Sequence, residues 1–193
     1  FVVVRRVDGK LTAVPYPKAY AKPMAAIAAE LKAAAAEIAD PKEAPLKAYL
    51  LAAATAFRTN DWKPADEAWS KMHALNSRWY VRVGPDETYW EPCSRKAGFH
   101  LTFARINPGS VAWQKKLVPV RQEMENAIAA LVGPPYKARK VSFRLPDFID
   151  ILLNAGDDRH PFGATIGQSL PNWGPVANEG RGRTVAMSNL YTD

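Results

Sequence analysis

Polar side chains that could bind or polarise a substrate gather in three short segments of the chain. They are Glu87, Tyr89 and Glu91 within DETYWEP (86–92), Asp147 and Asp150 in the second segment, and Ser169 and Asn172 in the third. A carboxylate beside a phenol can hold a free ammonium group and donate a hydrogen bond to a developing oxyanion. The structural alternative is that these groups cap turns and helices.

Asp147 illustrates that alternative. It follows Pro146 and precedes the run FIDILLNAG, so its carboxylate is suited to be the N-cap of a helix. Composition alone favours this helix cap over a substrate contact. Both interpretations stay open on the sequence.

Other catalytic patterns are missing from the sequence. The three histidines, His73, His100 and His160, do not stand at the spacing of a His-x-x-x-His or His-Glu-x-x-His motif, and no Cys-x-x-Cys pair exists. A zinc site formed by this chain is therefore not expected. His100 lies in a strand-like run, where a packed histidine is more common than a ligand. Cys93 has no partner for an internal disulfide.

Composition limits the class of protein. The chain has 193 residues, 48% of them hydrophobic, and a net charge of +7. Its basic residues are spread along the sequence, which argues against a nucleic-acid-binding protein. No run reaches the roughly 18 apolar residues of a membrane span, and the first residues lack the order of a signal peptide. We expect a soluble protein, cytoplasmic rather than exported, and the sequence leaves its compartment undetermined.

The hydrophobic spacing predicts an α+β fold, with a helical part (about 17–76) packed with a mixed, β-rich part (about 77–193). In domain terms, residues 1–76 form a hairpin and helices, and 77–193 form a substrate-binding part. The expected elements are a hairpin over 1–20 with a turn at Asp8-Gly9, helices over 23–40, 41–57, 64–75 and 110–131, and strands over 77–84, 98–107 and 140–145. Pro119 should kink or split the last helix.

Several motifs in this order resemble the dipeptidyl peptidase III family of zinc metallopeptidases. They are VRRVDGKLTAVPY, the Ala-rich helix pair, NDWKPADEAW, VGPDETYWEPCSRKAGF, the helix ending in ALVGPP, LPDFIDILLNAGDD, and QSLPNWGPVANEGRG followed by TVAMSNLY. The likeness covers most of the chain. It implies a portion of a two-lobed peptidase that removes dipeptides from peptide amino termini and binds the peptide between its lobes.

The resemblance also implies roles for individual residues. Glu87 would bind the free amino terminus of the peptide, and Tyr89 would stabilise the tetrahedral intermediate. Asp147 and Asn172 match further substrate-binding positions of the family. Ser169 stands where the family commonly has an asparagine, and His100 where it has an acidic residue.

The zinc-binding helices of the family have no counterpart in this sequence. The chain begins at Phe1 rather than Met and ends in NLYTD, and we therefore expect it to be the N-terminal portion of a longer or cleaved enzyme. On this interpretation the zinc cofactor and its ligands belong to a segment or chain that partners this one. The alternative is a non-catalytic peptide-binding or scaffold protein that kept the cleft without zinc.

Overall fold

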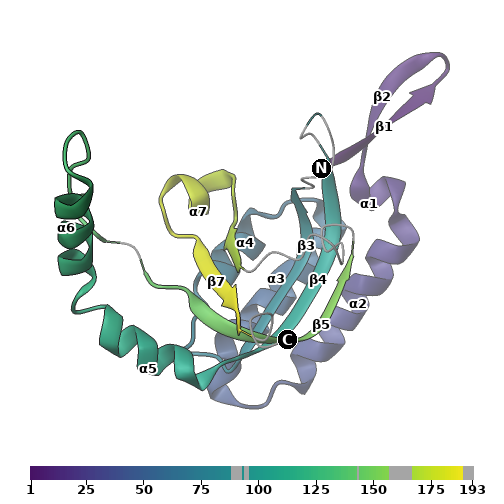
Figure 1. The fold of residues 1–193 in the computed structure, drawn as a ribbon. Helices are drawn as coiled ribbons and strands as arrows, with labels where there is room; N and C mark the ends of the chain where they lie inside the picture. Colours follow the sequence, from purple (N-terminus) through teal and green to yellow (C-terminus); the bar gives the residue numbers. More distant parts are fainter. Residues whose placement is uncertain (88–92, 94–95, 143, 157–166, 189–193) are drawn as a thin grey trace.

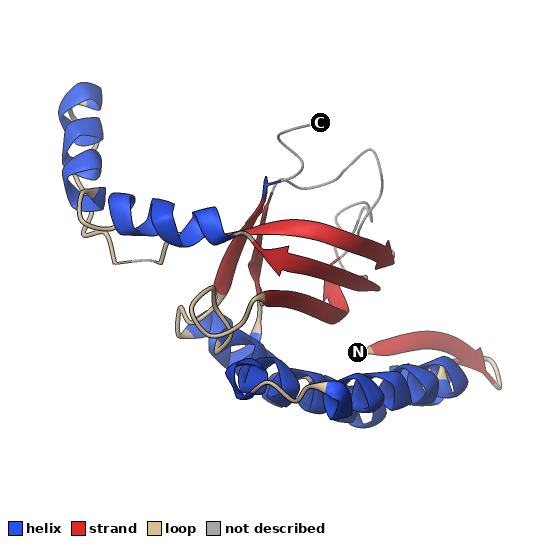
Figure 2. Cartoon of the chain, turned by 90° about the horizontal axis from the view of Figure 1, so that it is seen from below, coloured by secondary structure: helices blue, strands red, loops and turns tan. Residues whose placement is uncertain are grey.

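The computed structural model describes residues 1–87, 93, 96–142, 144–156 and 167–188, and it confirms the α+β fold class. Helices form one layer, and a sheet of five strands lies against it (Figure 2). The helical layer consists of α1 (Tyr16–Ala19), α2 (Ala21–Glu37), the 3-10 turn η1 (Pro41–Glu43), α3 (Ala44–Thr59) and α4 (Lys63–Ser70). None of the helices within the described ranges is long and apolar enough to cross a membrane.

The helix predictions hold because local signals dominate in this part of the chain. Asp40 accepts a hydrogen bond from the Lys42 backbone N–H and so caps η1, while Asn60, at φ 66°, ends α3 in the left-handed conformation. The α2–α3 contact uses small side chains such as Ala28 and Ala53, both buried. Small residues let the two helices approach closely, and the wide Ala-rich stripe is thereby buried.

Helix α4 ends at Ser70, several residues before the expected end at Leu75. The Asn76 side chain accepts a hydrogen bond from the His73 backbone N–H and donates one to the Lys71 carbonyl. These bonds give the backbone of residues 71–76 an alternative to another helical turn. The predicted end of this helix is therefore wrong by about one turn.

The main sheet has the order β3-β4-β5-β7-β6. Its strands are β3 (Trp79–Glu87), β4 (Ala97–Ile106), β5 (Asp147–Gly156), β6 (Gly167–Leu170) and β7 (Arg183–Met187). The β5–β7 pair is parallel and the other pairs are antiparallel. The predicted strands over 77–84 and 98–107 are confirmed as β3 and β4. The predicted hairpin is confirmed as β1 (Val2–Val7) and β2 (Lys10–Pro15), which projects from the body in Figure 1.

The run FIDILLNAG is a strand, which corrects the prediction of a helix capped by Asp147. This segment forms β5 in the interior of the sheet, where it pairs with β4 on one side and β7 on the other. Ile149 is completely buried. Pairing with two distant strands fixes the backbone of this segment, so the local helix signal does not decide its structure.

The stretch after β4 forms two helices, α5 (Pro108–Leu117) and α6 (Arg121–Val132), and this confirms the predicted break at Pro119. No strand is present among the described residues of 140–145, so that prediction is wrong. The reason is that α6 side chains take up the neighbouring backbone groups. Gln122 Oε1 accepts from the Val141 N–H, and Glu125 Oε1 accepts from the Arg139 N–H. A short helix, α7 (Gly174–Asn178), lies between β6 and β7.

Candidate functional site

Two of the predicted site residues, Glu87 and Asn172, meet in the structure. Glu87 is the last residue of β3, and Asn172 follows the end of β6. The Asn172 side chain donates a hydrogen bond from Nδ2 to Oε1 of Glu87. Asn172 is exposed and Glu87 is half-buried. The fold thus brings a carboxylate and an amide from segments 85 residues apart to one place at the surface.

Glu87 lies next to a buried network of polar and charged side chains. The Arg82 guanidinium donates to both carboxylate oxygens of Asp86, over 3.0 and 2.6 Å, and to Oδ1 of Asp66 over 2.9 Å. His100 Nε2 lies 3.3 Å from Asp86 Oδ2. All four side chains are buried. The network joins α4, β3 and β4 directly beneath the strand end that carries Glu87.

Burial and charge pairing have opposite effects on the pKa values of Arg82 and Asp66 in this network. Burial disfavours the charged guanidinium of Arg82, but Asp86 and Asp66 outweigh it, so the pKa of Arg82 is raised. For Asp66, burial is the largest effect and raises the pKa of the carboxyl despite its bond to Arg82. Arg82 donates two hydrogen bonds to Asp86 and one to Asp66. The Arg82–Asp86 pair is therefore the main ionic contact at the end of β3.

His100 takes a different place from the one the resemblance implies. Its side chain is completely buried beside Asp86, and it lies on β4 opposite Gly84 of β3. This position suits a residue that supports the strand end. Its contact with a substrate stays a prediction.

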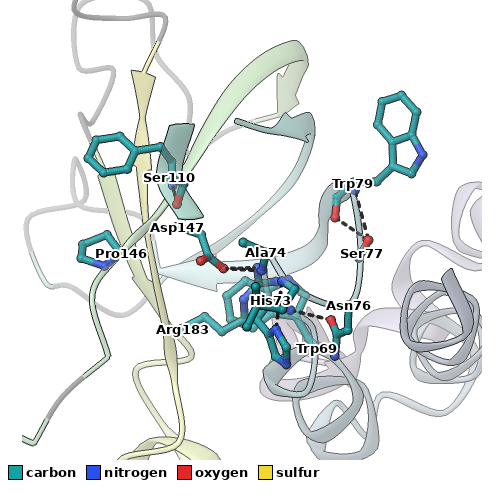
Figure 3. Close-up of polar contacts among 12 residues, drawn as sticks. Trp69, His73, Ala74, Asn76, Ser77, Trp79, Ser110, Pro146, Asp147 and Arg183 are labelled. Atoms are coloured by element: carbon teal, nitrogen blue, oxygen red, sulfur yellow. Dashed lines mark hydrogen bonds and ion pairs between the residues drawn. The ribbon is translucent and has the colours of Figure 1, made fainter. Parts of the chain in front are cut away.

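Asp147 is buried, and Figure 3 shows it close to Ala74, in the segment after α4, and to Arg183 of β7. Its carboxylate accepts hydrogen bonds from Gln114 Nε2 at 2.9 Å, the Ala74 backbone N–H at 3.1 Å and Arg183 Nη2 at 3.2 Å. Burial lowers the pKa of the neighbouring His73. Three protein donors thus occupy the Asp147 carboxylate, and its predicted contact with a substrate stays a prediction.

Ser169 lies on β6, three residues before Asn172, and is exposed. Its hydroxyl lies 2.8 Å from the hydroxyl of Thr184 on β7. Of the predicted site residues, Ser169 and Asn172 therefore share one segment, and Glu87 faces that segment from β3. Tyr89 lies outside the described residues.

Sequence reasoning missed Arg82 and Asp66. A signal was available, because Arg82 stands in the middle of an apolar strand-like run, and a buried guanidinium needs carboxylate partners. Asp86, four residues later, points to the same face of the strand as Arg82. Asp66 had no comparable local signal.

The outer edge of β3 is covered by side chains of the helices. Tyr49 of α3 accepts a hydrogen bond from the Val83 N–H at 2.9 Å and donates one to the Val83 carbonyl at 3.1 Å. The Trp69 indole N–H donates to the Val81 carbonyl at 3.0 Å. Gly84 leaves room for the Trp62 ring, since a Cβ at this position would lie 2.6 Å from that ring. These bonds occupy the outer backbone groups of Val81 and Val83, so another strand cannot pair with them while the helices remain in place.

Comparison with known proteins supports a class for this fold. No protein-family profile and no curated protein matches the chain. Solved structures do match it, and the two described below are bacterial peptidases. The chain thus has the α+β fold seen in one part of these peptidase structures.

The two structures are of dipeptidyl peptidase III, from Caldithrix abyssi and from Corallococcus sp. strain EGB. The match to the first has a TM-score of 0.83 and 29% sequence identity, and it covers 100% of this chain and 36% of the Caldithrix abyssi chain. The second has a TM-score of 0.75 and 28% identity, with 100% and 35% covered. The resemblance inferred from the sequence is confirmed over the whole chain, which spans about a third of the length of these proteins.

The described residues do not fit a zinc site of their own. Within these ranges, no group of three or more His, Cys, Asp or Glu side chains is arranged to hold a metal ion. The buried carboxylates of Asp66 and Asp86 are engaged with Arg82 instead.

Proposed function

We propose that this chain binds the amino-terminal end of a peptide as the substrate-binding portion of a zinc-dependent dipeptidyl peptidase III. The single observation that carries the proposal is the meeting of Glu87 and Asn172 at the surface. It supports the proposal because the resemblance assigns both residues to substrate binding, although no local pattern links them.

The chemistry of this pair fits a free ammonium group. The Glu87 carboxylate provides the negative charge, and the Asn172 amide bond orients it. An ammonium group of a peptide would form a charge-assisted hydrogen bond with Glu87, which is stronger than a bond between neutral groups. A peptide blocked at its amino end would lose this bond.

The terminal strand β6 gives the rest of the peptide a place to bind. In the described part of the chain, β6 pairs with β7 alone. An extended peptide can add to such a strand through main-chain hydrogen bonds, which are independent of the peptide's side chains. Ser169 lies on β6 and Asn172 just beyond it, so the peptide would run along β6 with its amino end at Glu87.

The other predicted site residues take supporting roles in this proposal. Tyr89 stands two residues after Glu87 and would donate a hydrogen bond to the oxyanion in the complete enzyme. His100 and Asp147 would act as positioning residues. His100 lies next to Asp86, and three hydrogen-bond donors hold the carboxylate of Asp147. Zinc would come with a further polypeptide segment, and we assign no step of hydrolysis to the residues described here.

Calorimetric titration with tetra-alanine and with N-acetylated tetra-alanine tests the proposal. We expect the free-amine peptide to bind about tenfold more tightly, a difference of about 1.4 kcal/mol. Glu87→Gln should remove this preference, whereas Glu179→Gln, which changes an exposed glutamate on a neighbouring segment, should keep it. Equal affinity for both peptides in the unchanged chain would exclude the assigned role of Glu87.

A measurement of peptide cleavage distinguishes a peptidase from a non-catalytic peptide-binding protein. Cleavage of dipeptides from a peptide should appear only when a zinc-bearing partner segment and zinc are both present. Tyr89→Phe should then reduce turnover strongly and leave peptide affinity nearly unchanged. Full turnover in this variant would exclude the role of Tyr89.

A further inference from the structure

Helix α6 carries an apolar stripe that no described part of the chain covers. The stripe consists of Val120, the residue directly before the helix, and of Met124, Ile128 and Leu131 within it; they are 38%, 50%, 48% and 87% exposed. Spacings of four, four and three residues place them on one face of the helix. We call these four residues the α6 stripe.

The opposite face of α6 is covered by the segment that follows the helix. Glu125 is buried and accepts hydrogen bonds from the Tyr136 hydroxyl and from the backbone and side chain of Arg139. Gln122 donates to the Arg139 carbonyl and accepts from the Val141 N–H. The returning segment thus holds α6 in a defined orientation, and the α6 stripe faces away from it.

The α6 stripe lies far from the body of the protein. In Figures 1 and 2, α5 and α6 form an arm that extends away from the sheet and the helical layer, with α6 at its end. On α5, Trp113 is also 56% exposed. Exposed apolar side chains in a row indicate a surface that binds another protein.

The arm together with the segment that follows it, up to Pro146, carries most of the net charge of the chain. Residues 108–146 contain seven Lys and Arg and two Glu, a net charge of +5 out of +7 for the whole chain. A partner for this surface should therefore present an apolar groove with acidic residues at its rim.

The comparisons indicate which polypeptide has room to cover the stripe. The match to the Caldithrix abyssi protein includes this whole chain, and therefore the arm, yet it uses only 36% of that protein. The arm thus belongs to the shared fold, and those proteins have nearly two thirds of their length left to pack on it.

We propose that the α6 stripe is the docking face for the polypeptide that supplies the remaining part of a dipeptidyl peptidase III fold. This rests on the proposed function only in assuming that such a polypeptide exists. Docking would bury Met124 and Ile128, and it would fix the arm relative to the body without involving Glu87.

Cysteine labelling measures this burial directly. In a Cys93→Ser background, Met124→Cys and Ile128→Cys are made in the isolated chain and in a hybrid in which this chain replaces the matching part of the Caldithrix abyssi protein. We expect alkylation by a maleimide to be at least about tenfold slower in the hybrid, because a buried thiol is shielded from reagent. Val4→Cys and Leu11→Cys on the exposed hairpin are matched controls, since Val4 and Leu11 are 61% and 71% exposed. The controls should label at the same rate in both proteins.

Equal labelling of the stripe positions in the folded hybrid and in the isolated chain would overturn the proposal. Slower labelling of the isolated chain at higher concentration, with a doubled mass in solution, would assign the stripe to a second copy instead. Slower labelling on vesicles containing phosphatidylserine would assign it to a membrane surface. In a Glu87→Gln hybrid the protection should persist, which separates this result from any failure of the peptide-binding proposal.

Discussion

The two terminal strands of the sheet, β3 and β6, have opposite surroundings. β3 has nine residues, and helical side chains bond to its outer backbone groups at Val81 and Val83. β6 has four residues, and within the described ranges its backbone pairs with β7 alone. An unpaired strand edge attracts another strand, so proteins cover the edges they do not use. On the proposed function, β3 serves stability and β6 serves peptide binding.

Glu87 stands at the end of β3, the strand whose outer edge is covered by helical side chains. β3 is fixed by Tyr49, by Trp69 and by the Arg82–Asp86 pair, so the residue at its end is held in place. A charged group that must meet a ligand in one geometry benefits from such support. Substitutions within β3 before Glu87 should therefore affect stability, and those at Glu87 and near β6 should affect peptide affinity.

Removing Arg82 should have the largest effect. Arg82→Met leaves the buried carboxylates of Asp66 and Asp86 without their cation, and we expect a loss of about 3–5 kcal/mol in the free energy of unfolding. Urea denaturation measures this value. Arg78→Met is the matched control, because Arg78 is exposed in its contact with Glu43 and should change stability by less than about 1 kcal/mol. Equal effects of the two substitutions would contradict the claim that Arg82 stabilises β3.

Tyr49→Phe should have the next largest effect. The ring remains, but the buried N–H and carbonyl of Val83 lose their partner, which costs about 1–3 kcal/mol. Thermal or urea unfolding detects this loss. Tyr20→Phe, at an exposed tyrosine, should stay within about 0.5 kcal/mol. A stable Tyr49→Phe variant would mean that the edge of β3 does not depend on this hydroxyl.

Asp66→Asn tests the electrostatics of the same edge through pH. Burial raises the pKa of Asp66 above its usual value of 3.8, so the folded protein holds this proton more tightly than the unfolded chain. Stability from this group is then present below pH 3.8 and decreases as the pH rises through the folded-state value. Asp66→Asn should remove that decrease, as measured by urea denaturation across a pH series. An unchanged pH dependence would contradict the assignment.

Asn172→Ala should have the smallest effect on stability, because Asn172 is exposed. We expect a change within about 0.5 kcal/mol but a threefold to tenfold loss of affinity for tetra-alanine, about the value of one hydrogen bond. Asn178→Ala on α7 is the control and should affect neither quantity. If Asn172→Ala bound the peptide with full affinity, the bond between Asn172 and Glu87 would have no role in binding.

Much of the fold followed from local signals in the sequence. Asp8-Gly9 predicted the hairpin, Asp40-Pro41 predicted the start of the second helical segment, and Pro119 predicted the break between α5 and α6. Each of these residues acts on its own backbone. For this reason a single sequence is enough to find them.

The failed and missing predictions depend on contacts between distant segments. Residues 147–156 form β5 because β4 and β7 pair with them, and no local pattern records that pairing. Likewise Tyr49 meets Val83 across 34 positions, and Asn172 meets Glu87 across 85. The site residues were predicted from the order of family motifs, since spacing along the chain does not show which loops meet.

Amide hydrogen exchange with and without tetra-alanine tests the central claim, that β6 is the binding edge and β3 the closed one. Successive amides of a strand point to opposite sides, so only one of the Gln168 and Ser169 amides points away from β7. At saturating peptide, that amide should exchange at least about tenfold more slowly, because pairing with the peptide protects it. The Val83 amide, already bonded to Tyr49, should keep its rate. Bound peptide with unchanged exchange in β6 would contradict the account.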